Sequence, residues 1–296
     1  MAAGAGSASH TLDEFTKILR FHADDATKSI IEVCSLDSYC RLGKGVELTT
    51  ALSAWFAGDI FGALSPDFLD FLRIQLHGTI GITDAEQMNK FIIDNTKGKI
   101  QGSFSNAALR NVPLVFVSCL YFKAVWEKPF LRSSTIKDTF YGINDNFICN
   151  MMKKCVEMNY VDDPKAQICM LPYAMASNTS DSNSPRWQAM IILPKEAGLG
   201  PLMDIFASLS SDLNLFRTVI HACQDCSKQE VELSLPRFSL KCTTPLTHPL
   251  SQMGLRVAFS PTADFSLITK STPIFVSEIV HEIVVEVNEG INALKA

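Results

Sequence analysis

The chain has 296 residues, of which 47% are hydrophobic and 19% are charged, enough apolar material for a substantial core in a soluble globular protein. Its formal net charge of −5 is spread over small clusters of mixed sign without a Lys/Arg block, which excludes an extended surface for nucleic acid. No run reaches the roughly 18 apolar residues of a membrane span, and the start, "MAAGAGSASH", lacks the basic and apolar regions of an export signal. We therefore expect a soluble protein that binds neither nucleic acid nor membrane.

Amphipathic helix patterns are concentrated in the first half of the chain. Residues 11–20, "TLDEFTKILR", place apolar side chains on one face, with Thr11 as the expected cap and Glu14 three residues later, as in a capping box. Residues 65–76 open with Ser and Pro, a common start for a helix. Residues 84–98 predict a further helix that stops at its final glycine, which adopts positive φ without strain.

Two long strand patterns lie in the first half, and shorter strand patterns dominate from Phe140 onward. Residues 46–57 mix β-branched and aromatic side chains, and residues 112–126 are almost continuously apolar, as in a strand covered on both faces of a sheet. A helix-like stretch (199–216) and a polar loop (174–185) interrupt four shorter strand patterns, at 166–173, 187–194, 231–240 and 279–287. This order favours an α+β domain over a repeated βαβ unit.

The motifs of common enzyme sites are missing from the sequence. It contains no G-x-S-x-G, no H-E-x-x-H and no P-loop, so we expect a protein that is not an enzyme. Among the six histidines, His281 differs because it interrupts a strand with apolar neighbours. We expect its imidazole to be buried and to need hydrogen-bond partners, as a core histidine that bears on sheet stability or opening.

The nine cysteines are an odd number scattered among hydrophobic runs, which is typical of buried thiols in a reducing compartment. Cys223 and Cys226, in "CQDC", could supply half of a zinc site, but only His221 lies near them in sequence. We expect no metal and no cofactor. Asn178, in "NTS", matches a glycosylation acceptor, which matters only if the protein is secreted.

Several runs, in order along the chain, resemble the serpin family of serine protease inhibitors. "VPLVFVSCLYFKAVWEKPF" (112–130) is similar to the family's "LVLVNAIYFKGxWxxPF", and "MNKFIIDNTKGKI" (88–100) to its "INxWVxxxTxGxI". "VELSLPRFSL" (231–240) and "LSQMGLRVAFSPTADFSLI" (250–268) resemble "VxLPRFxI" and "LxxLGIxxxFxxxADFSxI". "VSEIVHEIVVEVNEG" resembles the strand that leads into the family's reactive loop.

The resemblance implies a three-sheet α+β fold whose helices pack on a large central mixed sheet. It implies a monomer that inhibits a target serine or cysteine protease by a suicide mechanism. The protease cleaves an exposed loop, which then inserts as an extra strand into the central sheet and carries the covalently held protease with it. Because insertion pairs an edge that the native sheet leaves open, it releases stored free energy.

The resemblance also assigns residues to the parts of that mechanism. It places the hinge of the reactive loop at Glu289, Gly290, Ile291, Asn292 and Ala293. Compared with the inhibitory pattern "VNEEGTEAAAAT", the chain has one acidic residue fewer, and Ile291 and Lys295 replace small residues. Bulk and an unpaired charge would slow insertion, and this favours a non-inhibitory binding or carrier protein as an alternative.

The gate that lets the sheet open is assigned to Ser118, Trp126 and His281. Ser118 stands where the family usually has an Asn that hydrogen-bonds the strand histidine, here His281. Since a serine hydroxyl is shorter and offers fewer donors than an amide, we expect either a weakened clasp between the two central strands or a bridging water.

From the family pattern, we expect residues 1–296 to form a single domain that lacks the family's first helices, the bait loop beyond the hinge and the last strands. A non-functional fragment is therefore a further alternative. The family implies the extracellular space, although no signal peptide is visible, and the cysteine usage favours the cytoplasm as the alternative.

Overall fold

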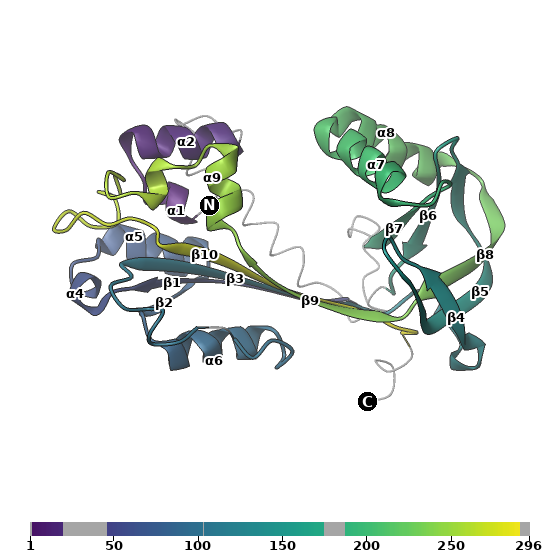
Figure 1. The fold of residues 1–296 in the computed structure, drawn as a ribbon, viewed down its shortest axis with the longest axis horizontal. Coiled ribbons are helices and arrows are strands. Elements are labelled where there is room, and N and C mark those ends of the chain that lie inside the picture. The colour runs from purple at the N-terminus through teal and green to yellow at the C-terminus, as the bar shows by residue number, and fades with distance from the viewer. Residues whose placement is uncertain (1, 20–45, 103, 175–186, 291–296) are drawn as a thin grey trace. The chain divides into compact units, whose positions relative to one another are not determined.

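The computed structural model describes residues 2–19, 46–102, 104–174 and 187–290, and it has the expected α+β character (Figure 1). The chain divides into two compact units. The first unit comprises residues 1–41, 48–122 and 240–285, and the second comprises residues 42–47, 123–239 and 286–296. In the part of the chain that the structure describes, no helix is long and apolar enough to cross a membrane.

The first unit is built on a five-stranded sheet with the order β2-β1-β3-β10-β9. The strands are β1 (Val46–Phe56), β2 (Thr79–Ile82), β3 (Leu114–Ala124), β9 (Phe238–Pro245) and β10 (Glu278–Val287). The strand patterns expected around 46–57, 112–126 and 279–287 are thereby confirmed. Central strand β3 has almost no exposed surface from Leu114 to Val117, which explains why that part of its sequence is apolar at consecutive positions.

Helices cover both faces of this sheet (Figure 1). On one face, α6 (Ala85–Asn95) buries Met88, Phe91 and Ile92 against Val115 and Val117. On the other face, a larger core joins Phe15 and Phe68 to Phe116 and the segment 255–276. The helices of this second layer and their short extensions are α1 (Ala2–Ala5), α2 (Ser9–Leu19), α4 (Gly58–Phe61), α5 (Pro66–Asp70), η2 (Phe71–Gln75), α9 (Thr247–Met253) and η4 (Val257–Phe259).

The second unit is an antiparallel sheet with two helices. β4 (Thr135–Tyr141), β5 (Asn146–Asp162), β6 (Ala166–Pro172) and β7 (Gln188–Pro194) follow one another in space, and β8 (Lys228–Pro236) pairs along β5. α7 (Leu199–Ser211) and α8 (Leu213–Asp225) pack on β6 and β7 through Ile205, Val219 and Cys223. The short turn η3 (Arg132–Ser134) leads into β4.

Three sequence-based expectations differ from the structure. The single helix expected over 199–216 is two helices, separated at Asp212, whose carboxylate accepts hydrogen bonds from the first backbone N–H groups of α8. The single strand expected over 231–240 is interrupted at Arg237, between β8 and β9. The capping box was wrong as well, because α2 begins at Ser9 and the side chains of Thr11 and Glu14 bond the chain near residues 256–264 instead.

Candidate functional site

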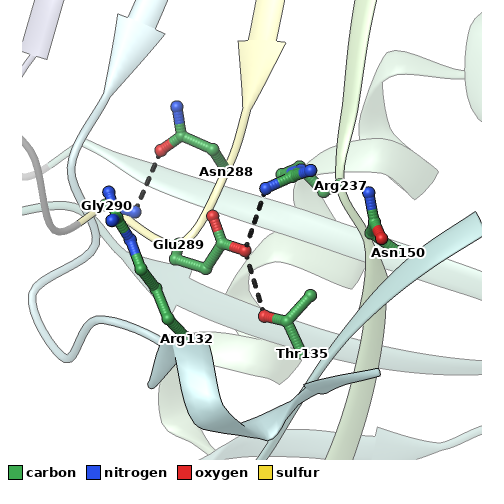
Figure 2. A pocket seen from close by; sticks show the side chains of 7 residues that line it. All are labelled: Arg132, Thr135, Asn150, Arg237, Asn288, Glu289 and Gly290. Carbon is green, nitrogen blue, oxygen red and sulfur yellow. Dashed lines mark hydrogen bonds and ion pairs between the residues drawn. The ribbon is translucent and has the colours of Figure 1, made fainter. Parts of the chain in front are cut away.

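The end of strand β10 lies at an open pocket in the second unit. β10 ends at Val287, and the next three residues, Asn288, Glu289 and Gly290, line a pocket of about 530 Å³ (Figure 2). The other lining residues are Arg132, Thr135, Asn150 and Arg237. We call Asn288–Gly290 the hinge root, because the family resemblance predicts a reactive-loop hinge that begins at Glu289.

Two residues from the turn after β3 hold the backbone of the hinge root. The indole Nε1 of Trp126 donates to the carbonyl oxygen of Asn288 at 2.8 Å, and the amide of Phe130 donates to the carbonyl oxygen of Glu289 at 3.0 Å. Trp126 and Phe130 are both buried, and the indole stacks on the ring of Tyr173 with a centroid distance of 4.7 Å. Since buried aromatic rings have little freedom to move, these donors are held in place for the hinge root.

The side chain of Glu289 is anchored from two directions. Only 8% of it is exposed, and its Oε1 accepts a hydrogen bond of 3.0 Å from the hydroxyl of Thr135. The same oxygen lies 3.5 Å from Nη1 of Arg237, the residue that separates β8 from β9 (Figure 2). A buried carboxylate needs such partners, so these contacts make the position of Glu289 depend on Thr135 and Arg237.

Gly290 gives the hinge root its turn. Its φ of +80° lies in the left-handed region, which favours glycine, and a Cβ at this position would lie 3.1 Å from the backbone nitrogen of Trp126. Its amide donates to the side-chain oxygen of Asn288 at 2.9 Å (Figure 2). The chain therefore leaves β10 through a turn that only glycine fits without strain.

The two predicted gate residues of the first unit, Ser118 and His281, line one cavity. Ser118 lies on β3 and His281 on the neighbouring strand β10, and the cavity has a volume of about 1020 Å³. Among the described residues, no hydrogen bond joins these two side chains. Both are partly exposed, so the expected burial of His281 was wrong: the alternation of β10 buries Val280, Glu282 and Val284 instead.

Glu282 is a buried charge-bearing residue that the sequence did not indicate. Its side chain is 0% exposed, and its Oε2 accepts a hydrogen bond of 2.6 Å from Thr243 on β9. Among the described residues, its Oε1 has no hydrogen-bond partner. Burial raises the pKa of this carboxyl above its ordinary value. On β3, burial together with the Glu282 charge raises the pKa of the Cys119 thiol to about 12. A carboxyl group that resists ionisation therefore lies in the sheet between β3 and β9.

The structure does not test every predicted site residue. Ile291, Asn292 and Ala293 of the hinge and Asn178 of the glycosylation pattern lie outside the described residues. Cys223 is buried in α8, and the Cys226 thiol donates to the Cys223 carbonyl oxygen at 3.1 Å. No group of three His, Cys, Asp or Glu side chains within the described ranges could hold a metal ion.

Comparison with known families and structures identifies the chain. The family model described as "Serpin (serine protease inhibitor)" matches residues 1–295. The chain belongs to the serpin family. A serine protease inhibitor of Cyanea capillata is 28% identical to this serpin over 96% of the chain and 75% of the relative. The leukocyte elastase inhibitor of Xenopus laevis is also 28% identical, over the same shares of the two chains.

Solved structures confirm the serpin fold. Human thyroxine-binding globulin, in complex with its hormone, has a TM-score of 0.80 to this serpin at 22% identity, over 97% of this chain and 76% of that one. The aligned residues make up 75% of each of these two inhibitors and 62% of the serine protease inhibitor A3F of Mus musculus. These three matches each cover 96% of this chain and only part of the relative.

Proposed function

We propose that this serpin provides the sheet and the hinge of a serine protease inhibitor. The observation that carries the proposal is the hinge root at the end of β10, where Glu289 is buried against Thr135 and Arg237. The protein is not an enzyme in this proposal. Its partner is a serine or cysteine protease that it meets as a monomer, and the protease attacks a bond in the loop that follows the hinge root.

The contacts at the hinge root fit a segment that must be held and then released. In the proposal, the loop enters the sheet between β3 and β10, the neighbouring strands that carry Ser118 and His281. Entry requires the chain to reverse at Gly290, whose left-handed conformation already turns it away from the line of the strand. The few polar contacts of the hinge root would break at that moment, and the new strand pairs would more than replace them.

The chain's own hinge sequence favours slow insertion. In an inserting strand, alternate side chains face the core, so Ile291 and Lys295 lie on the same face. Burial of an unpaired lysine costs several kcal/mol, and a branched Ile at the first inserted position adds bulk. We propose that these two residues, more than the sheet or the hinge root, limit inhibition.

A pair of chimeras tests both parts of this proposal. The first chimera joins residues 1–290 to the loop and closing strands of the Xenopus laevis leukocyte elastase inhibitor. The second keeps residues 291–296 of this chain and joins the same inhibitor at the position equivalent to the end of Ala296, so that both loops have the same length. Each is incubated with leukocyte elastase and examined on denaturing gels. We expect the first chimera to form a complex that is stable in SDS, and the second to be cleaved with little or no complex.

The outcomes separate the sheet from the hinge sequence. If both chimeras are cleaved without a complex although their circular dichroism shows a folded protein, the inhibitor proposal is wrong. If both trap elastase equally well, the proposed effect of Ile291 and Lys295 is wrong. Residues 1–296 without an added segment serve as the control in each incubation.

A carrier function is the second candidate. The cavity beside Ser118 and His281, about 1020 Å³ in volume, is lined by apolar residues that include Phe15, Leu76 and Phe116. Such a volume suits a small apolar ligand, and human thyroxine-binding globulin shares the fold. Binding of thyroxine, followed by equilibrium dialysis and weakened by Phe116→Ala, would support this candidate, and no binding would count against it.

A further inference from the structure

The pocket at the hinge root differs from the cavity beside Ser118 in the kind of ligand that it suits. Apart from Gly290, the described residues that line it are all polar or charged: Arg132, Thr135, Asn150, Arg237, Asn288 and Glu289 (Figure 2). All of them belong to the second unit. Its volume of about 530 Å³ is in the range of small-molecule sites, but without apolar walls it offers little to an apolar ligand.

The lining of this pocket is rich in hydrogen-bond donors that the protein does not use. Among the described residues, the Arg237 guanidinium makes one contact, at 3.5 Å to Glu289, and this leaves most of its N–H groups to solvent or a ligand. The side-chain oxygen of Asn288 accepts from the amide of Gly290, and its side-chain nitrogen has no partner in that part of the chain. Asn150 adds a further amide, held beside Arg237 by a backbone hydrogen bond of 2.8 Å.

The charges at the pocket favour an anion. Arg132, on the turn η3 before β4, brings a second guanidinium to the lining, so two positive charges face the one negative charge of Glu289. The Glu289 side chain is only 8% exposed, and Thr135 and Arg237 already hold its Oε1. A ligand therefore meets mainly guanidinium and amide donors, which are the groups that recognise oxyanions.

We propose that this pocket binds the phosphate group of a small hydroxylated molecule. The donors come from three parts of the chain: η3, β5 and the junction of β8 and β9. A phosphate group accepts hydrogen bonds through three oxygens that point in different directions, whereas a carboxylate offers two in one plane. The pocket has room beyond the phosphate, where the amides of Asn150 and Asn288 suit hydroxyl groups.

The proposed site concerns a ligand other than the protease, and it does not depend on the proposed function. It shares the hinge root with that function, because Asn288, Glu289 and Gly290 form part of its lining. A phosphate bound to Arg132 and Arg237 joins the hinge root to the rest of the second unit.

Isothermal titration calorimetry of the whole chain with glucose 6-phosphate, at constant ionic strength, tests the proposal. We expect a Kd of about 1 mM or lower. Inorganic phosphate should bind several-fold more weakly, and glucose and acetate should not bind at the same concentrations. If glucose 6-phosphate does not bind, or if acetate or glucose binds equally well, the proposal is wrong. Equal affinity for inorganic phosphate would overturn the part that concerns the hydroxylated body of the ligand.

Four variants test whether the phosphate binds at this pocket. Arg132→Gln and Arg237→Gln should each raise the Kd for glucose 6-phosphate about tenfold, because each removes a charged donor. Glu289→Gln should lower the Kd, because it removes the negative charge beside the ligand, and a higher Kd would contradict the charge argument. Arg217→Gln, at an exposed position on α8, is the matched control and should leave the Kd unchanged. If both pocket arginines can be replaced without effect in variants that are folded by circular dichroism, the site is refuted.

Discussion

Glu289 at the end of β10 and Arg237 between β8 and β9 meet at 3.5 Å, although a long stretch of chain separates them. Glu289 is the buried partner, and Arg237 remains 46% exposed. The pair connects the hinge root to the sheet of the second unit through one side chain from each. It is one of the contacts that hold the hinge root, beside the hydrogen bonds from Trp126, Phe130 and Thr135.

The two partners should respond unequally to truncation. Glu289→Ala removes the ion pair and the acceptor of Thr135, so we expect the free energy of unfolding to fall by about 1–2 kcal/mol. Arg237→Ala should cost less than about 1 kcal/mol, because the Arg237 side chain is 46% exposed and Glu289 keeps its hydrogen bond from Thr135. Urea denaturation measures both. Lys195→Ala, which breaks a surface pair of 2.7 Å with Asp162, is the control, and a loss there equal to that of Glu289→Ala would contradict the expectation.

The turn at Gly290 should tolerate no side chain. Gly290→Ala introduces a Cβ at 3.1 Å from the Trp126 nitrogen and forces a positive φ on alanine, so we expect a loss of about 1–2 kcal/mol and faster proteolysis beyond residue 288. Gly200→Ala is the matched control in α7, where an added Cβ meets no atom of the described residues within 4 Å. That change should leave stability unchanged or raise it, because alanine is the better helix former. Equal effects at both sites would rule out the strain argument.

The strand pair β3–β10 should be strengthened by Ser118→Asn. An amide reaches further than the serine hydroxyl and adds donors toward His281, which lines the same cavity. We expect a higher melting temperature, measured by circular dichroism, and we expect the gain to disappear when His281 is replaced by Leu. No gain in the parent background would mean that the pair does not clasp the strands.

Glu282 should make stability depend on pH in a predictable direction. Burial raises the pKa of its carboxyl in the folded state, so its contribution is fully present below the ordinary value near pH 4 and is lost as the pH rises through the folded value. Glu282→Gln keeps an acceptor for Thr243 without the charge, so we expect the variant to be more stable than the parent by about 1–3 kcal/mol at pH 8. The advantage should shrink toward pH 4. Glu278→Gln, at a partly exposed position on the same strand, is the control and should show no such trend. If the free energy of unfolding of Glu282→Gln and of the parent changes with pH in the same way, the account is wrong.

Much of the fold could be predicted from the sequence because it depends on local pattern. The consecutive apolar residues of β3 reflect burial on both faces, and the motif around Gly290 marks the end of β10. The contacts of the hinge root could not be predicted in the same way. Arg237 and Thr135 reach Glu289 from distant parts of the chain, and no spacing in the sequence brings them together.

The misplaced residues share a physical cause. In β10, apolar side chains occupy both faces, so the alternation alone does not say whether His281 or Glu282 points inward, and the structure buries the glutamate. Thr11 and Glu14 have the spacing of a capping box, but a tertiary partner near residues 256–264 takes their hydrogen bonds.

The central claim is that the sheet of the first unit can accept a further strand between β3 and β10. Its most direct test is thermal denaturation of the protein after incubation with a synthetic strand peptide rich in Ala and Thr. A peptide of the same length with proline at alternate positions, which cannot form ladder hydrogen bonds, is the control. The account predicts a clear rise in melting temperature with the Ala- and Thr-rich peptide and none with the proline-containing control. If neither peptide changes the melting temperature, the account is contradicted.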